Sequence, residues 1–550
     1  MILNDYPRPQ LKRDEWICLN GPWEFQISNS SRKPDVYGSE IIVPFSPECE
    51  LSGIKRQIMP GEYIYYRKKI SVPSEFSDKR TILHFGAVDY EATVYINDAK
   101  VCNHTGGYLP FYVDISDYIV DNNAEIVVQV RDDSDTSYHS RGKQKIKRGG
   151  IWYTPQSGIY QTVWLEFVPD TYIQSLKITP VYDEKILEIS ATIIGEGKAY
   201  TTFEDKVYEL PARIPVQFAE DWSPDNPKLY YFTVKCGDDI VQSYFAMRKF
   251  SVDVDEKGIK RLFLNNKPYF HNGLLDQGYW QDGMYTAPSD EALIYDIELA
   301  KSMGFNVLRK HIKVEPLRWY YHCDRLGMIV WQDMINGGGH YKSCVVTWPV
   351  IFGFNIKDGN YKMFARENKA GRDEFKKELK ELIEHLYNCP SIALWTVFNE
   401  GWGQFDAASM YEYASKLDPT RIIDHASGWH DQGVGEVVSK HVYFKKYKFH
   451  PDKLGRCVLL SEFGGYNHKV NGHCFNNKNF GYKGYDTPEQ LKCALRELYQ
   501  VQIKQAYEKG LAAAIYTELT DVEDELNGLV TYDRKIVKLP ASEIKEIVSI

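Results

Sequence analysis

The chain has 550 residues and carries a net charge of -9 at pH 7. This length suggests about three domains, and the acidic balance argues against nucleic-acid binding, which needs a basic face. The aromatic fraction of 14%, with 40 Tyr and 12 Trp, is typical of a globular protein rich in flat rings.

Neither the N-terminus nor any later segment predicts export or membrane insertion. The first ten residues, MILNDYPRPQ, contain no apolar stretch of signal-peptide length, and no later run approaches a membrane span. We therefore expect a cytoplasmic protein without membrane contact. The ten cysteines, from Cys18 to Cys493, form no CxxC pair and no Cys/His cluster at zinc spacing. This pattern predicts reduced, buried thiols and no structural metal.

Two β-rich segments form the first half of the chain. Short β-branched and aromatic runs, separated by Gly, Pro, Asn and Asp turns, predict an N-terminal β jelly-roll sandwich over residues 1–170. We interpret its basic run RGKQKIKR, Arg141 to Arg148, as a solvated loop. Similar runs between Tyr172 and Val252 predict a small immunoglobulin-like β-sandwich over residues 171–255.

From about Leu262 onward, strands alternate with helical periods. Ser289, followed by two acidic residues, predicts the start of one helix, and an apolar face from Phe375 to Leu386 predicts another. Eight apolar segments predict strands: YFHNG, NVLRKH, MIVWQD, IALWTVFNE, RIIDHASG, VVSKHVYF, CVLLSEFGG and AAAIYTEL. Eight strands alternating with helices indicate a closed (β/α)8 barrel, a TIM barrel, over residues 256–550.

Two of the predicted barrel strands end on a glutamate. Glu400 follows the fourth strand, and Glu462 ends the seventh. Catalytic groups of parallel barrels lie at the C-terminal ends of the strands, and strands four and seven face each other across the mouth. The two carboxylates can therefore converge. Paired carboxylates flanking one bond are the working parts of glycoside hydrolysis, one as proton donor and the other as nucleophile or base.

These segments resemble glycoside hydrolase family 2, the group of β-galactosidases, β-glucuronidases and β-mannosidases, along the whole chain. The motifs GPWEFQ, GAVDYEATVYINDAKVCNHTGGYLPF and GGIWYTPQSGIYQTVWLE are similar to its sugar-binding jelly roll. The barrel landmarks of the family are similar to NVLRKH, CDRLGMIVWQD, WTVFNEGW, LLSEFGG and TDVEDELNGLVTYDR. The resemblance implies a retaining exo-β-glycosidase that requires no cofactor.

The resemblance also implies roles for three residues. Glu400 would be the general acid and base, and Glu462 the nucleophile that forms a glycosyl-enzyme intermediate. Retention then requires carboxyl groups about 5 to 5.5 Å apart, with the pKa of the acid raised by burial while the nucleophile stays ionised. Asn399 would hydrogen-bond the sugar 2-hydroxyl, and its alternative role is a cap at the strand end.

Strand two contributes a second pair of candidates. Arg309 and His311 are two residues apart, so both side chains point to one face, which we expect to be the barrel mouth. For Arg309 the alternative to substrate contact is a structural ion pair. The commoner family pattern has two residues between this arginine and the histidine, so the family's histidine role does not pass directly to His311.

Four further residues are candidates for the site. Tyr443, in KHVYF, resembles the tyrosine that hydrogen-bonds the nucleophile, with a packed core ring as the alternative. Asp333, in WQD, and Trp402, just after the acid, are candidate sugar contacts, and packing is the alternative for each. Asp276, in the loop after strand one, is a candidate on the same footing.

The nature of the sugar is the least constrained part of the sequence interpretation. β-Glucuronidases of the family carry an Asn-x-Lys motif near the last strand, and the corresponding residues here, 527–529, are NGL. The motif NHK at residues 467–469 lies a few residues after the nucleophile, which is the wrong place for a uronate-binding lysine. We therefore expect a neutral β-galactoside, with β-glucuronide or another β-glycoside as the alternative.

A function of another class is a non-catalytic carbohydrate-binding protein with a degenerate barrel. Two glutamates in good context speak against it, because a binding module does not need the pair. The sequence contains no GxxxxGK[ST] phosphate loop, no HExxH zinc helix and no GxSxG nucleophile elbow. We expect a carbohydrate substrate, no metal and no nucleic-acid partner, and the oligomeric state stays open, a homo-oligomer included.

Overall fold

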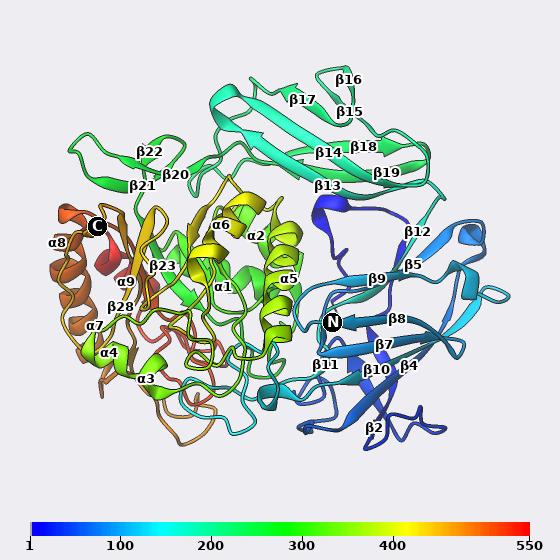
Figure 1. The fold of residues 1–550 in the computed structure, drawn as a ribbon, viewed down its shortest axis with the longest axis horizontal. Coiled ribbons are helices and arrows are strands. Elements are labelled where there is room, and N and C mark those ends of the chain that lie inside the picture. Colours follow the sequence, from blue (N-terminus) through cyan, green and yellow to red (C-terminus); the bar gives the residue numbers. More distant parts are fainter. Residues whose placement is uncertain (1–2) are drawn as a thin grey trace.

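The computed structural model describes residues 3–550. Figure 1 shows a β-sandwich on the right, a second one at the top and a barrel with helices on the left. The multidomain fold predicted from the sequence, two β-sandwiches followed by a TIM barrel, is confirmed. The mouth of the barrel, where α3 and α4 lie, faces downward in this view.

The N-terminal sandwich packs a four-stranded sheet, in the order β1-β12-β5-β9, against a six-stranded sheet, in the order β3-β2-β4-β10-β7-β8. Every second side chain along the strands points inward and fills the space between the sheets, and Trp23, Phe25 and Leu83 are part of this core. The bounds are β1 (Trp16–Cys18), β2 (Gly21–Ser28), β3 (Ser39–Val43), β4 (Tyr63–Ser71), β5 (Arg80–Phe85), β6 (Val88–Asp89), β7 (Glu91–Ile96), β8 (Ala99–Thr105), β9 (Phe111–Asp114), β10 (Asn123–Arg131), β11 (Gly158–Ile159) and β12 (Val163–Val168).

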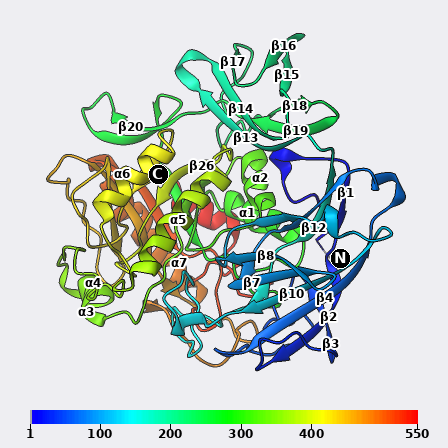
Figure 2. The same ribbon diagram turned by 45° about the vertical axis from the view of Figure 1, so that its right-hand side comes forward.

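The second sandwich pairs the sheet β13-β14-β17 with the sheet β16-β15-β18-β19. Its core includes Ile189, Val234 and Phe245. The bounds are β13 (Tyr172–Val181), β14 (Ile186–Ile194), β15 (Tyr200–Phe203), β16 (Lys206–Glu209), β17 (Ala212–Pro215), β18 (Tyr230–Cys236) and β19 (Asp239–Phe245). Figure 2 shows this sandwich above the other two bodies.

A small β-meander closes the N-terminal end of the barrel. It consists of β20 (Phe250–Val254), β21 (Lys260–Leu264) and β22 (Lys267–Pro268), so residue 255 lies inside it. Phe250 and Leu262 pack in one cluster with barrel residues such as Val307 and Ile515. Because apolar side chains plug this end, the polar chemistry of the barrel is left to the opposite end.

The barrel contains eight parallel strands in the order β27-β26-β25-β24-β23-β32-β29-β28. All eight strand segments predicted from the sequence are confirmed. In residues 3–550 no ladder joins β27 to β28, so the barrel is nearly closed rather than closed. The bounds are β23 (His271–Asp276), β24 (Val307–Lys310), β25 (Ile329–Asp333), β26 (Ile392–Thr396), β27 (Ile422–Asp424), β28 (Val437–Val442), β29 (Cys457–Gly464) and β32 (Leu511–Thr517). A short pair, β30 (Tyr466–Asn467) and β31 (Lys483–Gly484), follows β29.

The helices of the barrel confirm both helix predictions. Ser289 caps α1 by accepting a hydrogen bond from the Ala292 amide, and α5 buries its face from Phe375 to Leu386. Within the described chain, no helix lies between β27 and β28 or between β28 and β29. The bounds are α1 (Asp290–Ser302), α2 (Leu317–Leu326), α3 (Ser343–Val346), α4 (Trp348–Phe352), α5 (Lys369–Leu386), α6 (Ala407–Leu417), α7 (Pro488–Arg496), a π-helical turn (Glu497–Ile503), α8 (Lys504–Lys509) and α9 (Ala541–Val548).

A long loop of the N-terminal sandwich, residues 132–157, reaches the barrel mouth. The Arg141 amide donates to the Asn336 carbonyl over 2.9 Å, and Arg148 pairs with Glu523 and Asp524. Arg141 and Lys143 are buried, so the prediction that the basic run is a solvated loop is wrong for these residues. The physical reason is that the guanidinium of Arg141 satisfies two backbone carbonyls of the loop after β25.

Two further expectations concern the composition. Among the described residues, no helix is long and apolar enough to cross a membrane. All ten cysteines are unpaired, and the prediction of buried thiols is confirmed for five of them: Cys49, Cys236, Cys323, Cys389 and Cys457. It is wrong for Cys493, which is exposed.

Candidate active site

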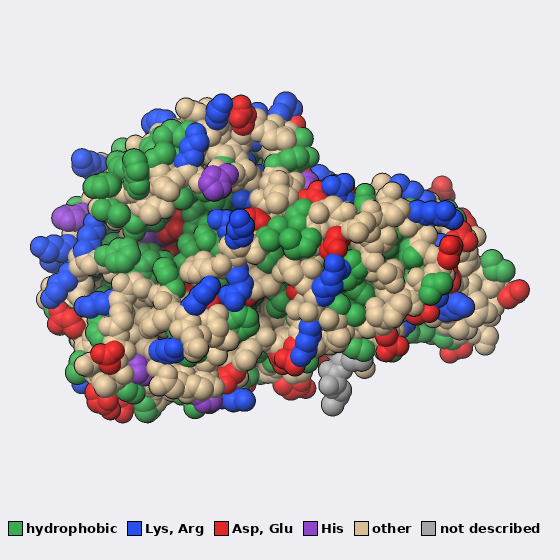
Figure 3. Space-filling view, turned by 90° about the horizontal axis from the view of Figure 1, so that it is seen from below, with side chains coloured by type: hydrophobic (Ala, Val, Ile, Leu, Met, Phe, Trp, Pro, Cys, Tyr) green, Lys and Arg blue, Asp and Glu red, His purple; other side chains and the backbone are tan. Residues whose placement is uncertain are grey.

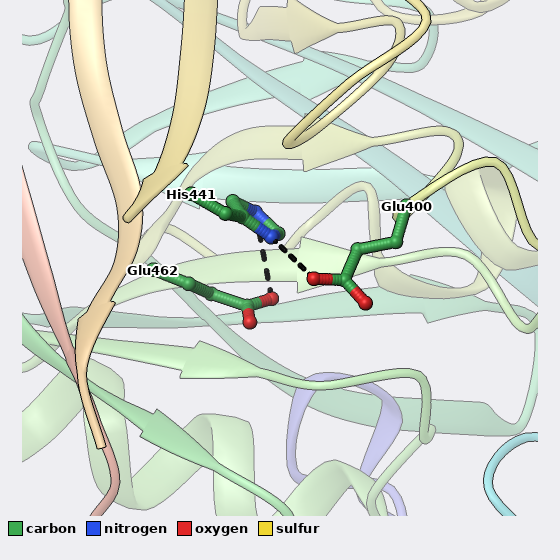
Figure 4. Close-up of side chains that lie close together, drawn as sticks. All are labelled: Glu400, His441 and Glu462. Carbon is green, nitrogen blue, oxygen red and sulfur yellow. Dashed lines mark hydrogen bonds and ion pairs between the residues drawn. The ribbon is translucent and has the colours of Figure 1, made fainter. Parts of the chain in front are cut away.

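The barrel mouth brings two glutamates and a histidine together. Glu462 lies inside β29 near its C-terminal end, and Glu400 lies four residues beyond the end of β26. One ligand atom from each of Glu400, His441 and Glu462 lies within 4.8 Å of the other two. Figure 4 shows His441 between the two carboxylates, with a contact to each. The convergence expected from the strand positions is present in the structure.

Glu400 is held at both its backbone and its carboxylate. Its φ of 53° places it in the left-handed region, where its amide donates to the Ser427 carbonyl over 2.9 Å. Its own carbonyl accepts a hydrogen bond from the Trp429 indole at 2.8 Å, and its Oε1 lies 2.8 Å from His441 Nδ1. Burial raises the pKa of Glu400 to about 8, against the opposing charges of Lys143 and Arg309. A carboxyl group in this setting retains its proton at neutral pH.

Glu462 has a different set of partners. Its Oε1 accepts from Arg309 Nη1 at 3.1 Å, and its Oε2 accepts from the Tyr443 hydroxyl. His441 Nε2 lies 3.5 Å from Oε1. Burial and the nearby Glu400 raise the pKa of Glu462 above its usual value, while the charge of Arg309 and the Tyr443 hydrogen bond act in the opposite direction. The structure thus places Tyr443 against this carboxylate.

Arg309 connects the ends of several strands. It donates from Nε to Asp333 at 3.0 Å, from Nη1 to the Ser461 carbonyl at 3.0 Å and from Nη2 to Asn399 Oδ1 at 2.9 Å. Burial alone would raise the pKa of Asp333, but the charge of Arg309 and the hydrogen bond with His311 hold it below its usual value. His311 Nδ1 lies 2.8 Å from Asp333 Oδ2, and burial lowers the pKa of this histidine to about 3.

Asn399 has an unused donor. Its Oδ1 accepts from Arg309, and its Nδ2 is buried without a hydrogen-bond partner among the described residues. Buried amide donors are rarely left unpaired, because the loss of hydration is costly. Nδ2 is therefore available to a bound ligand.

The sequence interpretation missed His441. This residue is on β28, two residues before Tyr443, so both side chains project to the same face of the strand. Its Nε2 also lies 3.0 Å from the Ser427 hydroxyl, and burial lowers its pKa to about 4, which keeps the ring neutral near pH 7. The strand period could have pointed to it once Tyr443 was singled out. His441, Glu400 and Glu462 are also the residues whose spacing could hold a metal ion.

Two other predicted site residues, Trp402 and Asp276, have contacts with residues other than the two glutamates. The ring of buried Trp402 is 6.3 Å from that of His311 and 5.2 Å from that of Trp152. Asp276 is the last residue of β23 rather than part of the following loop. Its carboxylate is engaged by Lys310 Nζ at 2.6 Å and by the Gly278 amide at 2.9 Å. The side-chain partners of Asp276 are therefore Lys310 and the Gly278 amide, and its role as a sugar contact stays a prediction.

A second wall of the mouth was not found from the sequence. Glu525 accepts hydrogen bonds from the Tyr153 hydroxyl and from Asn527 Nδ2, and Lys143 Nζ lies 3.9 Å from it. Tyr482 stacks on Tyr443 with ring centroids 3.7 Å apart. These residues come from the N-terminal loop and from segments after β29 and β32, so no local pattern connects them. Figure 3 views the molecule from below, the side on which the mouth lies.

Comparisons with known proteins give consistent results. Residues 254–499 match the model "Glycosyl hydrolases family 2, TIM barrel domain", and residues 54–169 match "Glycosyl hydrolases family 2, sugar binding domain". A β-galactosidase of Thermoanaerobacter pseudethanolicus is 29% identical over 389 residues, covering 65% of this chain and 47% of that protein. A putative β-glucuronidase of Formosa agariphila is 25% identical over 456 residues, covering 74% of this chain and 50% of that protein.

The chain spans about half the length of the curated relatives it matches. Among solved structures, a β-glucuronidase of an uncultured Clostridium sp. superimposes with a TM-score of 0.76 at 19% identity, covering 98% of each chain. At that identity the likeness concerns the fold.

The site makes a prediction about stability that is independent of its chemistry. Replacing Arg309 by Met should leave Asp333 and Glu462 as buried carboxylates without their cation, which costs about 3–5 kcal/mol. Denaturant unfolding followed by tryptophan fluorescence measures this loss. Arg213→Met, which removes an exposed pair with Glu184, is the control and should cost about 1 kcal/mol or less. Equal losses in the two variants would contradict the account of Arg309.

Proposed function

Because the chain belongs to glycoside hydrolase family 2, we propose that it is a retaining exo-β-glycosidase that hydrolyses terminal β-linked sugars by double displacement. The proposal depends above all on the spacing of Glu400 and Glu462: one carboxylate oxygen of Glu400 lies within 4.8 Å of one carboxylate oxygen of Glu462. Retaining enzymes hold the carboxyl groups about 5 to 5.5 Å apart, whereas inverting enzymes need about 6.5 to 9.5 Å to admit a water molecule. The observed spacing favours retention.

In the first step Glu462 attacks the anomeric carbon, and Glu400 transfers its proton to the departing glycosidic oxygen. The raised pKa of Glu400 supports its role as the acid, since the group carries a proton at neutral pH. Arg309 and Tyr443 hold the Glu462 carboxylate in place for attack. The products of this step are a glycosyl ester on Glu462 and the free aglycone.

In the second step Glu400, now ionised, takes a proton from water, and the water oxygen attacks the anomeric carbon of the ester. The sugar leaves with its original configuration, and Glu462 is released as a carboxylate. His441 lies within hydrogen-bond distance of Glu400 Oε1 and close to Glu462, and it holds the two carboxyl groups in position during both steps. Asn399 Nδ2 supplies a donor for the sugar 2-hydroxyl, a contact that strengthens in the transition state.

For the sugar itself we propose a β-galactoside. The position of the uronate-binding lysine in the Asn-x-Lys motif holds Leu529, which is buried. The first relative named above is a β-galactosidase, which is in line with this choice. A β-glucuronide is the second candidate, because the other two proteins named above bear that name. The loop over residues 132–157 walls one side of the mouth, which suits a pocket for a terminal sugar.

Variants of the two glutamates test the roles separately. Glu462→Ala and Glu400→Ala should each lose several orders of magnitude in kcat, since each group acts on the transition state. On 4-nitrophenyl β-galactoside, azide should rescue Glu400→Ala and give the glycosyl azide of retained configuration. The same anion should give the inverted azide with Glu462→Ala. Nuclear magnetic resonance of the products distinguishes the two anomers, and full activity of either variant would refute the assignment.

A panel of 4-nitrophenyl glycosides that includes the β-galactoside and the β-glucuronide distinguishes between the candidate functions. Turnover of a β-galactoside but not of a β-glucuronide would support the proposed sugar, and the opposite result would replace it. Binding of a sugar without turnover by the unmodified protein would favour the non-catalytic alternative.

The pH dependence of kcat/KM should follow the opposite requirements of the two carboxyl groups. Glu462 must be ionised, so activity should fall as the pH drops through a pKa above the usual 4.5. Glu400 must be protonated, so activity should fall as the pH rises through about 8. In Glu400→Gln, assayed with a leaving group that needs no proton, the alkaline fall should disappear. An unchanged alkaline limb in that variant would mean that another group is the acid.

A further inference from the structure

Lys143 is an N-terminal-domain residue at the mouth of the barrel. Its loop is fixed on one side by the bond from the Arg141 amide to Asn336 and on the other by the bond from the Tyr153 amide to the Lys143 carbonyl. The side chain is 7% exposed. Its Nζ lies over two aromatic rings, 5.5 Å from the centre of Tyr153 and 6.0 Å from that of Trp402. The fold thus places a positively charged side chain of the N-terminal domain at the candidate active site of the barrel domain.

The ammonium group of Lys143 is charge-paired but not hydrogen-bonded within residues 3–550. Its nearest carboxylate is that of Glu525, at 3.9 Å, which is beyond hydrogen-bond reach. Both oxygens of Glu525 already accept hydrogen bonds, one from the Tyr153 hydroxyl and one from Asn527. An ammonium group has three donors, and Nζ of Lys143, in a residue that is otherwise buried, is not among the atoms closed off from solvent without a partner. The three N–H bonds are therefore available for acceptors supplied by a ligand.

Lys143 is close enough to the reacting groups to act on them. Its charge lowers the pKa of Glu400 against the effect of burial, and it adds to the effect of burial on the pKa of His311. Trp402, which lies under the ammonium group, is the aromatic neighbour of His311. These neighbours place Lys143 beside the residues that surround the glutamate pair.

We propose that Lys143 is a specificity-determining residue that donates a hydrogen bond to a hydroxyl group of an uncharged glycone. This inference rests on the proposed function and specifies the sugar class of that site. The charges favour an uncharged sugar over an acidic one: Glu525 compensates Lys143, and Arg309 is compensated by Asp333 and Glu462. A sugar carboxylate would add a further negative charge to a buried site in which carboxylates already outnumber these cations.

The test measures binding, so that it does not depend on turnover. In a Glu462→Gln background, the ligands are 4-nitrophenyl β-galactoside, its 4-deoxy and 6-deoxy analogues, and 4-nitrophenyl β-galacturonide, titrated by calorimetry. Adding Lys143→Met should raise the dissociation constant of the galactoside by about 10-fold or more, which is the range expected for the loss of a hydrogen bond from a charged donor. The loss should vanish for the deoxy analogue that lacks the contacted hydroxyl. Lys143→Arg should retain part of the affinity, because it keeps a donor of the same charge.

The matched control is Lys147→Met, which removes an exposed lysine of the same loop and should bind all four ligands normally. An equal loss for all four ligands with Lys143→Met would overturn the proposal, because it would indicate a structural role. Tighter binding of the galacturonide than of the galactoside, abolished by Lys143→Met, would also overturn it and make Lys143 a reader of carboxylates. Either result leaves the double-displacement assignment untouched, since that is judged by the Glu400 and Glu462 variants alone.

Discussion

The buried guanidinium of Arg309 is the constraint on which the site depends. A cation with no exposed surface must be surrounded by acceptors, and here they come from the ends of β25 and β29 and from the segment after β26. The planar fork of arginine allows little freedom in where those acceptors stand. The same side chain therefore stabilises the mouth and sets the positions of Asn399 and Glu462. Its charge holds the pKa of Asp333 below its usual value and opposes the effect of burial on the pKa of Glu462.

The second principle of the site is asymmetry between two similar groups. Glu400 and Glu462 are both buried carboxyl groups within reach of one histidine, yet Glu400 has a neutral imidazole beside it, whereas Glu462 has a guanidinium and a phenol. Like charges this close cannot both be ionised without cost, so the group with the stronger partners is the one to carry the charge. The environment thus divides the acid from the nucleophile in the proposed reaction.

The sequence predicts those parts of the molecule that local patterns encode. Eight strand segments, the cap at Ser289 and the apolar face of α5 are all readable from spacing, and so is the convergence of Glu400 and Glu462, because parallel strands end at one edge. Tertiary contacts are not encoded in this way. Lys143 appears in the sequence as one of several loop lysines, and its burial depends on residues distant in sequence, such as Trp402 and Glu525. Asp276 forms an ion pair with Lys310 on the neighbouring strand, and the sequence of either strand alone does not predict this pair.

The central claim is that Glu462 forms a covalent bond to the sugar. It is tested most directly with 2,4-dinitrophenyl 2-deoxy-2-fluoro-β-galactoside, whose fluorine slows hydrolysis of the ester more than its formation. Peptide mapping by mass spectrometry should then find one fluorosugar per chain, attached to the peptide that contains Glu462. Turnover of unmodified galactoside with no trapped ester, or attachment to a different residue, would contradict the account.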